Sequence, residues 1–295
     1  MTFPFDIADI DRLTGGHIGT FDVACPLCAS ERRTSLNRRR KVLRIWRIEE
    51  GFATFHCARC GEKGHSRDAA RVLPDPIRLT AAAKEAETRE RSAIIVQRSK
   101  ARWLWDQRQP IGGTIAESYL RQARGYGGQL PGTLGFLPPR GEHGPAMIAA
   151  FGFPAEPEPG SIVIATSAVL GVHVTRLARD GFGKAGSERD KIMVGRSIGA
   201  PIVLAPANDL LGLAITEGIE DALTAYAATG LGAWAAASAS RMPALADAIP
   251  DYIEAVTLMV DDDEAGRGAS AILAGAIRRA EVWSMILPTV TGKAA

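Results

Sequence analysis

The chain has no uninterrupted apolar run of about 18 residues, the length that a membrane-spanning helix requires. Its N-terminus, MTFPFDIADID, is acidic and lacks the basic start and apolar core of a signal peptide. Only four cysteines occur in 295 residues, and their two close pairs do not resemble a disulfide framework. The formal net charge of +2 says little about partners. We therefore expect a cytoplasmic protein that does not enter a membrane.

Composition along the chain predicts a multidomain α/β protein with four parts. Residues 1–75 contain all the cysteines and are expected to form a small β domain. Residues 76–140 are expected to be a helical connector, because 77–109 contain no Gly or Pro and are rich in helix formers. Residues 141–206 contain the strand-like runs 161–165 and 169–177 and are expected to be a basic α+β subdomain.

Strands and helices alternate in the fourth part, residues 207–295. This alternation predicts an α/β domain with a mostly parallel sheet. The expected strands are 211–216, 231–238, 254–260 and 281–287, and the expected helices are 217–230, 241–249 and 263–280.

The cysteines form two C-x-x-C pairs, Cys25 with Cys28 and Cys57 with Cys60. Two intervening residues let a tight turn direct both sulfurs at one tetrahedral Zn²⁺, so two pairs supply a closed structural site. The intervening chain has room for two strands, 36–48 and 51–57, joined as the hairpin of a zinc ribbon. His17, His56 and His65 lie nearby, but four sulfurs already complete the coordination. The alternative is four unconnected buried cysteines, which the paired spacing disfavours.

A dense basic segment with an aromatic residue lies between the two pairs. Guanidinium groups beside aromatic rings suit phosphate contact and base stacking, so we expect nucleic-acid binding here. The alternative is a solvated basic face of the hairpin. The residues expected to contact nucleic acid are Arg38, Arg39, Arg40, Lys41, Arg44 and Trp46.

Carboxylates follow two of the expected strands. Glu217 opens the run EGIED after one strand, and Asp261 and Asp263 lie in VDDDEAG after another. In open parallel sheets, sites form at the carboxyl ends of strands, and Asp221 lies one helical turn beyond Glu217 on the same face. Carboxylates held together need a neutralising cation, and oxygen ligands suit Mg²⁺ or Mn²⁺. Helix capping is the alternative, but it explains one such acid more readily than two motifs.

At these residues the chain resembles the Toprim domain, which bacterial-type primases, topoisomerases and certain nucleases share. The resemblance implies that Asp261 and Asp263 bind a divalent metal and that Glu217 binds metal or acts as an acid or base. Asp221 matches the acidic residue of the primase pattern E-G-x-x-D. Glu217, Asp261 and Asp263 are therefore the expected catalytic residues, and Asp221 is an expected fourth ligand.

The resemblance to primases extends to other parts of the chain. The run FHCARCGEKGHSRDAAR resembles the second knuckle of a primase zinc ribbon, followed by a Gly-rich turn and a helix. Cys28 stands where that family usually has histidine. Residues 141–206 resemble the segment that precedes Toprim in primases, which makes Arg176 and Lys191 candidates for phosphate contact.

Two departures from that family follow. Relatives often carry further acidic residues after the last Toprim strand, whereas this sequence reads LPTVTGKAA there, which favours weakened activity. A Walker A motif is also missing, because Ala294 follows Gly292-Lys293 where Ser or Thr is needed, so a replicative helicase is expected to be a separate partner.

Three functions remain open from the sequence. The first is a DNA primase-like enzyme that transfers nucleotides from nucleoside triphosphates during primer synthesis on a single-stranded DNA template. The second is a Toprim-type nuclease that uses the same carboxylates to activate water. The third is a non-catalytic DNA-binding accessory protein of plasmid or phage replication. A topoisomerase is disfavoured, since no tyrosine lies in a recognisable nucleophile setting.

Overall fold

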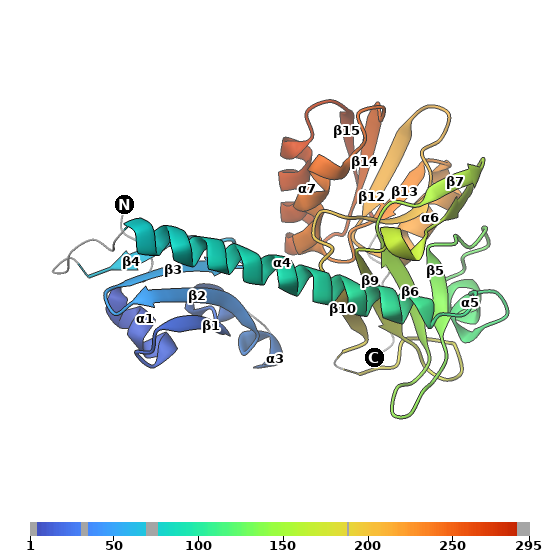
Figure 1. Cartoon of the computed structure of the whole chain (residues 1–295). Coiled ribbons are helices and arrows are strands. Elements are labelled where there is room, and N and C mark those ends of the chain that lie inside the picture. The colour runs from blue at the N-terminus through green and yellow to red at the C-terminus, as the bar shows by residue number, and fades with distance from the viewer. Residues whose placement is uncertain (1–4, 31–34, 69–75, 188, 288–295) are drawn as a thin grey trace. The chain divides into compact units, whose positions relative to one another are not determined.

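The computed structural model describes residues 5–30, 35–68, 76–187 and 189–287 (Figure 1). The chain divides into two compact units, Met1–Arg91 and Ser92–Ala295. No helix within the described ranges is long and apolar enough to cross a membrane. The run LPTVTGKAA, apart from its first residue, lies outside the described residues.

The first unit is a four-stranded antiparallel sheet in the order β1-β2-β3-β4. The strands are β1 (Gly19–Ala24), β2 (Lys41–Glu49), β3 (Phe52–Cys57) and β4 (Lys63–Arg67). The helices are α1 (Ile7–Thr14), α2 (Pro26–Ala29) and α3 (Ser35–Arg38). The β2–β3 hairpin confirms the expected pair of strands. The helix expected at the end of the run FHCARCGEKGHSRDAAR lies partly outside the described residues. Residues 63–67, within that run, form β4 and pair with β3.

Alternation along β2 sets the inner face of this sheet. Leu43 and Ile45 are fully buried and pack with Phe55, Ile10 and three of the cysteines in one core. Arg47 follows the same alternation and is 4% exposed. Its guanidinium pairs with Asp11 and donates to the Glu50 carbonyl at 2.8 Å. The basic run therefore contributes one arginine to the interior of the unit.

The second unit begins within α4 (Pro76–Asp106), whose C-terminal end covers an antiparallel sheet. That sheet has the order β10-β9-β6-β5, from β5 (Leu134–Leu137), β6 (Ala146–Phe151), β9 (Gly171–Arg176) and β10 (Lys191–Gly195). Ala101 and Trp105 of α4 pack against one face. The loops carry α5 (Ile115–Ser118), the π-helix Tyr119–Ala123, the 3-10 turn Thr166–Ala168 and the hairpin β7 (Ala155–Glu158) with β8 (Ser161–Val163).

A five-stranded sheet completes the unit, in the order β11-β13-β12-β14-β15. Its strands are β11 (Ile202–Ala205), β12 (Gly212–Thr216), β13 (Gly232–Ala235), β14 (Ala255–Val260) and β15 (Glu281–Ile286). All neighbouring strands are parallel except β11, which runs antiparallel to β13. This confirms the expected α/β domain with a mostly parallel sheet.

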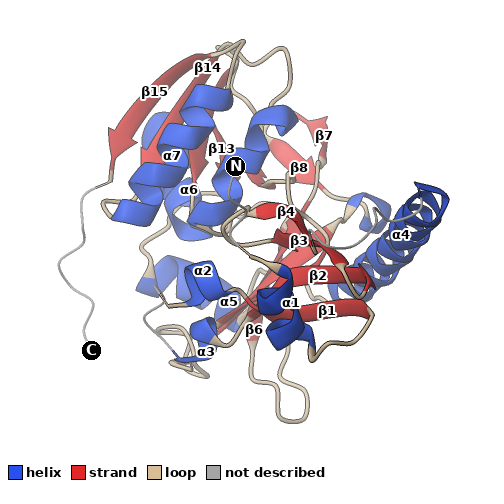
Figure 2. Ribbon diagram, turned by 90° about the vertical axis from the view of Figure 1, so that its left-hand side faces the viewer, coloured by secondary structure: helices blue, strands red, loops and turns tan. Residues whose placement is uncertain are grey.

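Helices cover both faces of this sheet. The helix α6 (Ile219–Thr229) shares one core with β11 and β13, and α7 (Glu264–Ala276) shares another with β12 and β14. Figures 1 and 2 show α7 beside β14 and β15. The helix expected at 241–249 is a 3-10 helix, Ala239–Ala248, because in an α-helix the ring of Pro243 would clash with the carbonyl four residues earlier.

A polar network joins α6 to the preceding subdomain. The Glu220 carboxylate accepts a hydrogen bond from the Tyr119 hydroxyl at 2.5 Å and lies 3.2 Å from the Lys184 ammonium. Arg124 donates to the Tyr119 oxygen at 2.9 Å. Burial alone would raise the pKa of Glu220, but the Lys184 charge and the Tyr119 hydrogen bond hold this pKa at about 2. Glu220 is therefore charged in the folded protein at neutral pH.

We predict that Glu220→Gln lowers the free energy of unfolding at neutral pH by about 2 kcal/mol, because a charge-assisted buried network is broken. The pKa of Glu220 falls from an ordinary 4.5 to about 2 on folding. Its contribution is therefore present above pH 4.5 and lost as the pH falls towards 2. Urea denaturation at neutral pH measures the first effect, and the same experiment at pH values from 4.5 down towards 2 measures the second.

Glu281→Gln is the matched control, since Glu281 is exposed at the start of β15. Equal stability losses in the two variants, or an unchanged acid dependence in Glu220→Gln, would contradict the assignment of this network.

Candidate functional site

The four cysteines converge in the first unit. Their sulfurs all lie within 4.8 Å of one another, with 3.9 Å between Cys25 and Cys60 and 3.9 Å between Cys28 and Cys57. A tetrahedral zinc ion with bonds of about 2.3 Å requires sulfurs about 3.8 Å apart. The donor set therefore fits a four-thiolate zinc site, and no histidine of the described residues belongs to it.

Local backbone geometry produces the two knuckles. Cys25 precedes α2, where Pro26 occupies the first turn and the Ala29 N–H donates to the Cys25 carbonyl at 2.9 Å. In the second knuckle the Arg59 N–H points at the Cys57 sulfur, 3.4 Å away. Burial and the neighbouring thiols raise the pKa of Cys28 to about 12. A divalent cation is therefore needed to hold all four sulfurs as thiolates.

The outer face of the same sheet is basic and aromatic. Cross-strand partners project on the same side, so the register of Trp46 with Thr54, and of Thr54 with His65, places these three on one face. Two further sets of cross-strand partners lie on this face, one on each side of the Trp46–Thr54–His65 set. One set is Arg44, His56 and Lys63, and the other is Phe52 and Arg67. Phe52 and His65 stack with their ring centroids 6.0 Å apart.

The structure divides the basic residues expected to contact nucleic acid. Arg38, Arg39, Arg40 and Lys41 are exposed at the end of α3 and the start of β2. Arg44 instead forms a bidentate pair with Asp22, at 2.7 and 2.8 Å, which compensates its charge. Lys63 and Arg67 were not singled out from sequence, because β4 was not expected and only pairing brings them to this face.

The acidic motifs meet at one edge of the parallel sheet. β12 and β14 are neighbours, with Thr216 in register with Met259. Glu217 directly follows β12, and Asp261 directly follows β14. Asp221 occupies the first turn of α6. Glu217, Asp221 and Asp261 are partly buried. The sequence-expected acids from two distant motifs are thereby brought to the carboxyl ends of adjacent strands.

Two glycines of these motifs permit close approach to the acids. A Cβ on Gly218 would collide with the carboxylate of Asp221, and one on Gly266 would lie 2.7 Å from the Asp261 carbonyl oxygen. The Thr216 hydroxyl also donates to the Gly218 carbonyl at 2.6 Å, which fixes the turn after β12. The glycines in E-G-x-x-D and D-x-D-x-A-G therefore have a steric role.

The three aspartates after β14 differ in their surroundings. Asp263 is the N-cap of α7, and its carboxylate accepts from the Gly266 N–H at 2.7 Å. Asp262 pairs with Arg267. The capping interpretation thus applies to Asp263, while its charge still acts on Glu217.

Burial and the neighbouring carboxylates together raise the pKa values of two of these acids. The pKa of Glu217 is raised by burial and then by the charges of Asp261 and Asp263. The pKa of Asp221 is raised by burial, by Asp261 and by Glu220. The Lys191 charge opposes both shifts. The neighbouring carboxylates therefore add to the effect of burial at the carboxyl ends of these strands, and Lys191 offsets part of it.

Arg176 and Lys191 were both expected from the sequence to contact phosphate, but their side chains lie on opposite faces of the sheet. Lys191 is in register with Thr175, so its side chain projects on the opposite face from those of Arg176 and Ile192. Lys191 acts on the carboxylates of Glu217 and Asp221, whereas Arg176 lines a hollow on the α4 side.

The donor set at the sheet edge fits a hydrated divalent cation. Among the described residues, the cysteine sulfurs form the group of three or more possible ligand atoms that all lie within 4.8 Å of one another. The carboxylate oxygens at this site are therefore more widely spaced than the sulfurs. Mg²⁺ keeps several waters and binds through one or two carboxylates, which suits such spacing. Glu217, Asp221 and Asp261, with Asp263, are the residues that would hold it.

Comparisons with known protein families match two stretches of the chain. Residues 212–293 match the Toprim domain family, and residues 95–204 match a domain of unknown function, DUF7146. None of the curated proteins matches the chain significantly in sequence.

Two solved structures are similar to the chain over most of their length. The primase fragment of the bacteriophage T7 primase-helicase protein is 13% identical, with a TM-score of 0.34, over 92% of this chain and 91% of that one. The Aquifex aeolicus primase, comprising its zinc-binding and RNA polymerase domains, is 16% identical, with a TM-score of 0.40, over 98% and 80%. Both likenesses are low in identity and in TM-score. The family match and the cysteine geometry together show that residues 212–293 form a Toprim domain and that the chain also carries a four-cysteine cluster suited to zinc.

Proposed function

We propose that this protein is a DNA primase-like nucleotidyltransferase that makes primers on single-stranded DNA in replication. The observation that carries the proposal is the meeting of Glu217, Asp221 and Asp261 at the carboxyl ends of β12 and β14, in a domain that matches Toprim. The basic and aromatic face of the first unit supports the template as partner. We propose nucleoside triphosphates as the second substrate and a separate helicase as a further partner.

The charge of each side chain at this site suggests its role in the reaction. Mg²⁺ or Mn²⁺, when bound, stabilises phosphate charge and positions the reacting oxygens. The raised pKa of Glu217 suits its carboxylate to receive the proton of the attacking 3′-hydroxyl, since a base works best with a pKa nearer the working pH. The Lys191 ammonium lies beside these carboxylates and would contact the triphosphate. Attack on the α-phosphate then releases pyrophosphate.

Template binding is assigned to the first unit. Trp46 and Phe52 offer rings for stacking, and Arg38, Arg39, Arg40 and Lys41 offer charge to the phosphates. We propose that Zn²⁺ on Cys25, Cys28, Cys57 and Cys60 holds this face in shape, because three of these thiols are part of its core.

Primer synthesis is tested with single-stranded DNA, labelled nucleotides and Mg²⁺ or Mn²⁺. The wild type is expected to make short oligonucleotides, and Asp261→Asn with Asp263→Asn is expected to reduce synthesis at least a hundredfold. Asparagine is preferred to alanine because it still caps α7. Asp262→Asn, in the same loop, should retain activity.

The other two functions are distinct outcomes of this assay. If the wild type shortens the DNA in the absence of nucleotides and the same double variant does not, the protein is a Toprim-type nuclease and not a primase-like enzyme. DNA binding with neither extension nor cleavage would indicate a non-catalytic accessory protein.

Zinc is tested by metal analysis. The purified protein should contain about one zinc ion per chain, and Cys57→Ser should lose it together with the fold of the first unit, since a structural zinc site supplies folding energy. His56→Ala is the matched control, because His56 is exposed beside Cys57 and outside the cluster. Equal zinc content in the two variants would refute the assignment.

A further inference from the structure

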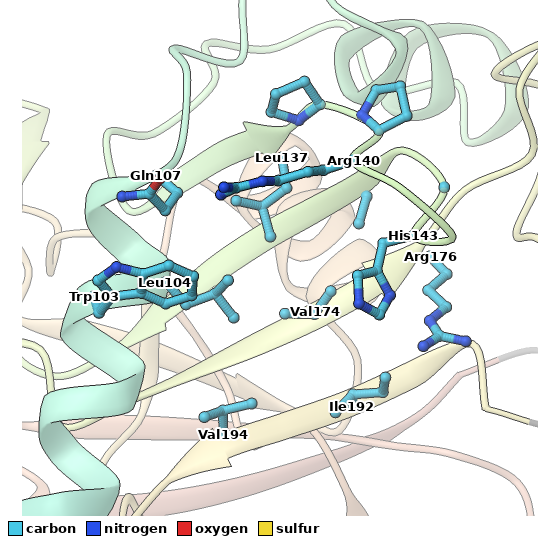
Figure 3. Close-up of a pocket in the computed structure, with 14 residues that line it drawn as sticks. Trp103, Leu104, Gln107, Leu137, Arg140, His143, Val174, Arg176, Ile192 and Val194 are labelled. Carbon is cyan, nitrogen blue, oxygen red and sulfur yellow. The ribbon is translucent and has the colours of Figure 1, made fainter.

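A hollow of about 510 Å³ lies on the face of the β10-β9-β6-β5 sheet that α4 covers (Figure 3). Small-molecule sites occupy roughly 300–1,000 Å³. Its floor is apolar and is made by strand residues and their connections. The floor residues are Leu137, Ala146, Val174, Ile192 and Val194.

The rim of the hollow combines an aromatic ring with cations. Trp103 projects from α4 and is 59% exposed, and Gln107 directly follows the last residue of this helix. Arg140 and His143 are joined by two backbone hydrogen bonds, at 2.9 and 3.0 Å, so their turn is held in place. Figure 3 shows His143 and Arg176 across the hollow from Trp103, with the Arg140 side chain reaching towards Gln107.

Charge decides which ligand such a hollow accepts. None of its lining residues is acidic. Neither Arg140 nor Arg176 forms an ion pair with another residue in the described part of the chain. A ligand must therefore offer an apolar plane to Trp103 and the floor, and negative charge to the guanidinium groups. A nucleobase with its phosphate has both features, because rings stack on tryptophan and phosphates pair with arginine.

We propose that this hollow binds a nucleobase together with its phosphate, either as a free nucleotide or within a single strand. The base stacks on Trp103 over the apolar floor, Gln107 and Arg140 meet its polar edge, and Arg176 holds the phosphate. The inference deepens the proposed function and rests on it for the class of ligand, but it adds a separate site, since the hollow and the carboxylates lie on opposite faces of this sheet. Arg176 lines the hollow, while Lys191 projects towards Glu217.

The test uses the whole 295-residue chain, loaded with zinc and with no other divalent cation added. One arm photo-crosslinks an oligonucleotide that contains 5-iododeoxyuridine, and the other photo-crosslinks 8-azido-ATP. The expected product is a modified peptide that contains Trp103, identified by mass spectrometry. Labelling of this peptide by the oligonucleotide identifies the ligand as a nucleotide within a single strand, and labelling by 8-azido-ATP identifies it as a free nucleotide.

Affinity for the productive probe gives the second measurement. Trp103→Ala should weaken binding roughly tenfold, within the range that loss of one stacked base gives. Arg140→Ala with Arg176→Ala should also reduce the salt dependence of binding. Trp283→Ala is the matched control, because Trp283 is likewise 59% exposed but lies on β15. Thermal unfolding checks that each variant is folded.

The Asp261→Asn, Asp263→Asn variant separates this inference from the proposed function, since crosslinking to the Trp103 peptide should survive in it even where synthesis is lost. The inference is overturned if neither probe labels the Trp103 peptide. It is also overturned if Trp103→Ala and Trp283→Ala bind both probes alike.

Discussion

Electrostatic repulsion at the carboxyl ends of β12 and β14 is the constraint on which the candidate site depends. Parallel pairing of these strands forces Glu217 and Asp261 to the same edge, and α6 adds Asp221. Burial and mutual repulsion raise the pKa values of Glu217 and Asp221. The fold tolerates this cost because β12, β14 and their covering helices bury a large apolar core around the strands. An arrangement that is costly without a cation and favourable with one is expected of a metal-dependent phosphoryl-transfer site.

The neighbouring Glu220 shows that the same helix turn can carry an acid with the opposite behaviour. Glu220 is one residue from Asp221, but Lys184 and Tyr119 compensate its charge and lower its pKa. It therefore ties α6 to the preceding subdomain instead of joining the repelling carboxylates.

In the first unit, too, the candidate metal ligands are part of the packing of the fold. Its cysteines form a core with Leu43 and Phe55, so a bound metal would stabilise the same small sheet as the apolar residues do. The other face of this sheet carries basic and aromatic side chains.

Much of this arrangement could be predicted from sequence, because the motifs lie where hydrophobic patterns end. The spacing of the cysteines and the alternation after residue 207 predicted the cluster and the parallel sheet. Features that depend on pairing could not be predicted. Lys63 and Arg67 reach the basic face only through β4, and Arg47 is buried because β2 alternates. The helix α1 has a local signal that we did not use, the reciprocal caps between Asp6 and Asp9. The partners of Glu220 are distant in sequence, so nothing near EGIED indicates them.

The central claim is tested most directly by the thermal stability of Glu217→Gln with and without Mn²⁺, in zinc-loaded protein. Removing a repelled charge should make the variant at least as stable as the wild type when no divalent cation is added. Mn²⁺ should then raise the unfolding temperature of the wild type much more than that of the variant, since binding stabilises the folded state by about 2.7 kcal/mol at a hundred times Kd. The account predicts this reversal of order. Equal stabilisation of both proteins by Mn²⁺, or a less stable variant in its absence, would contradict it.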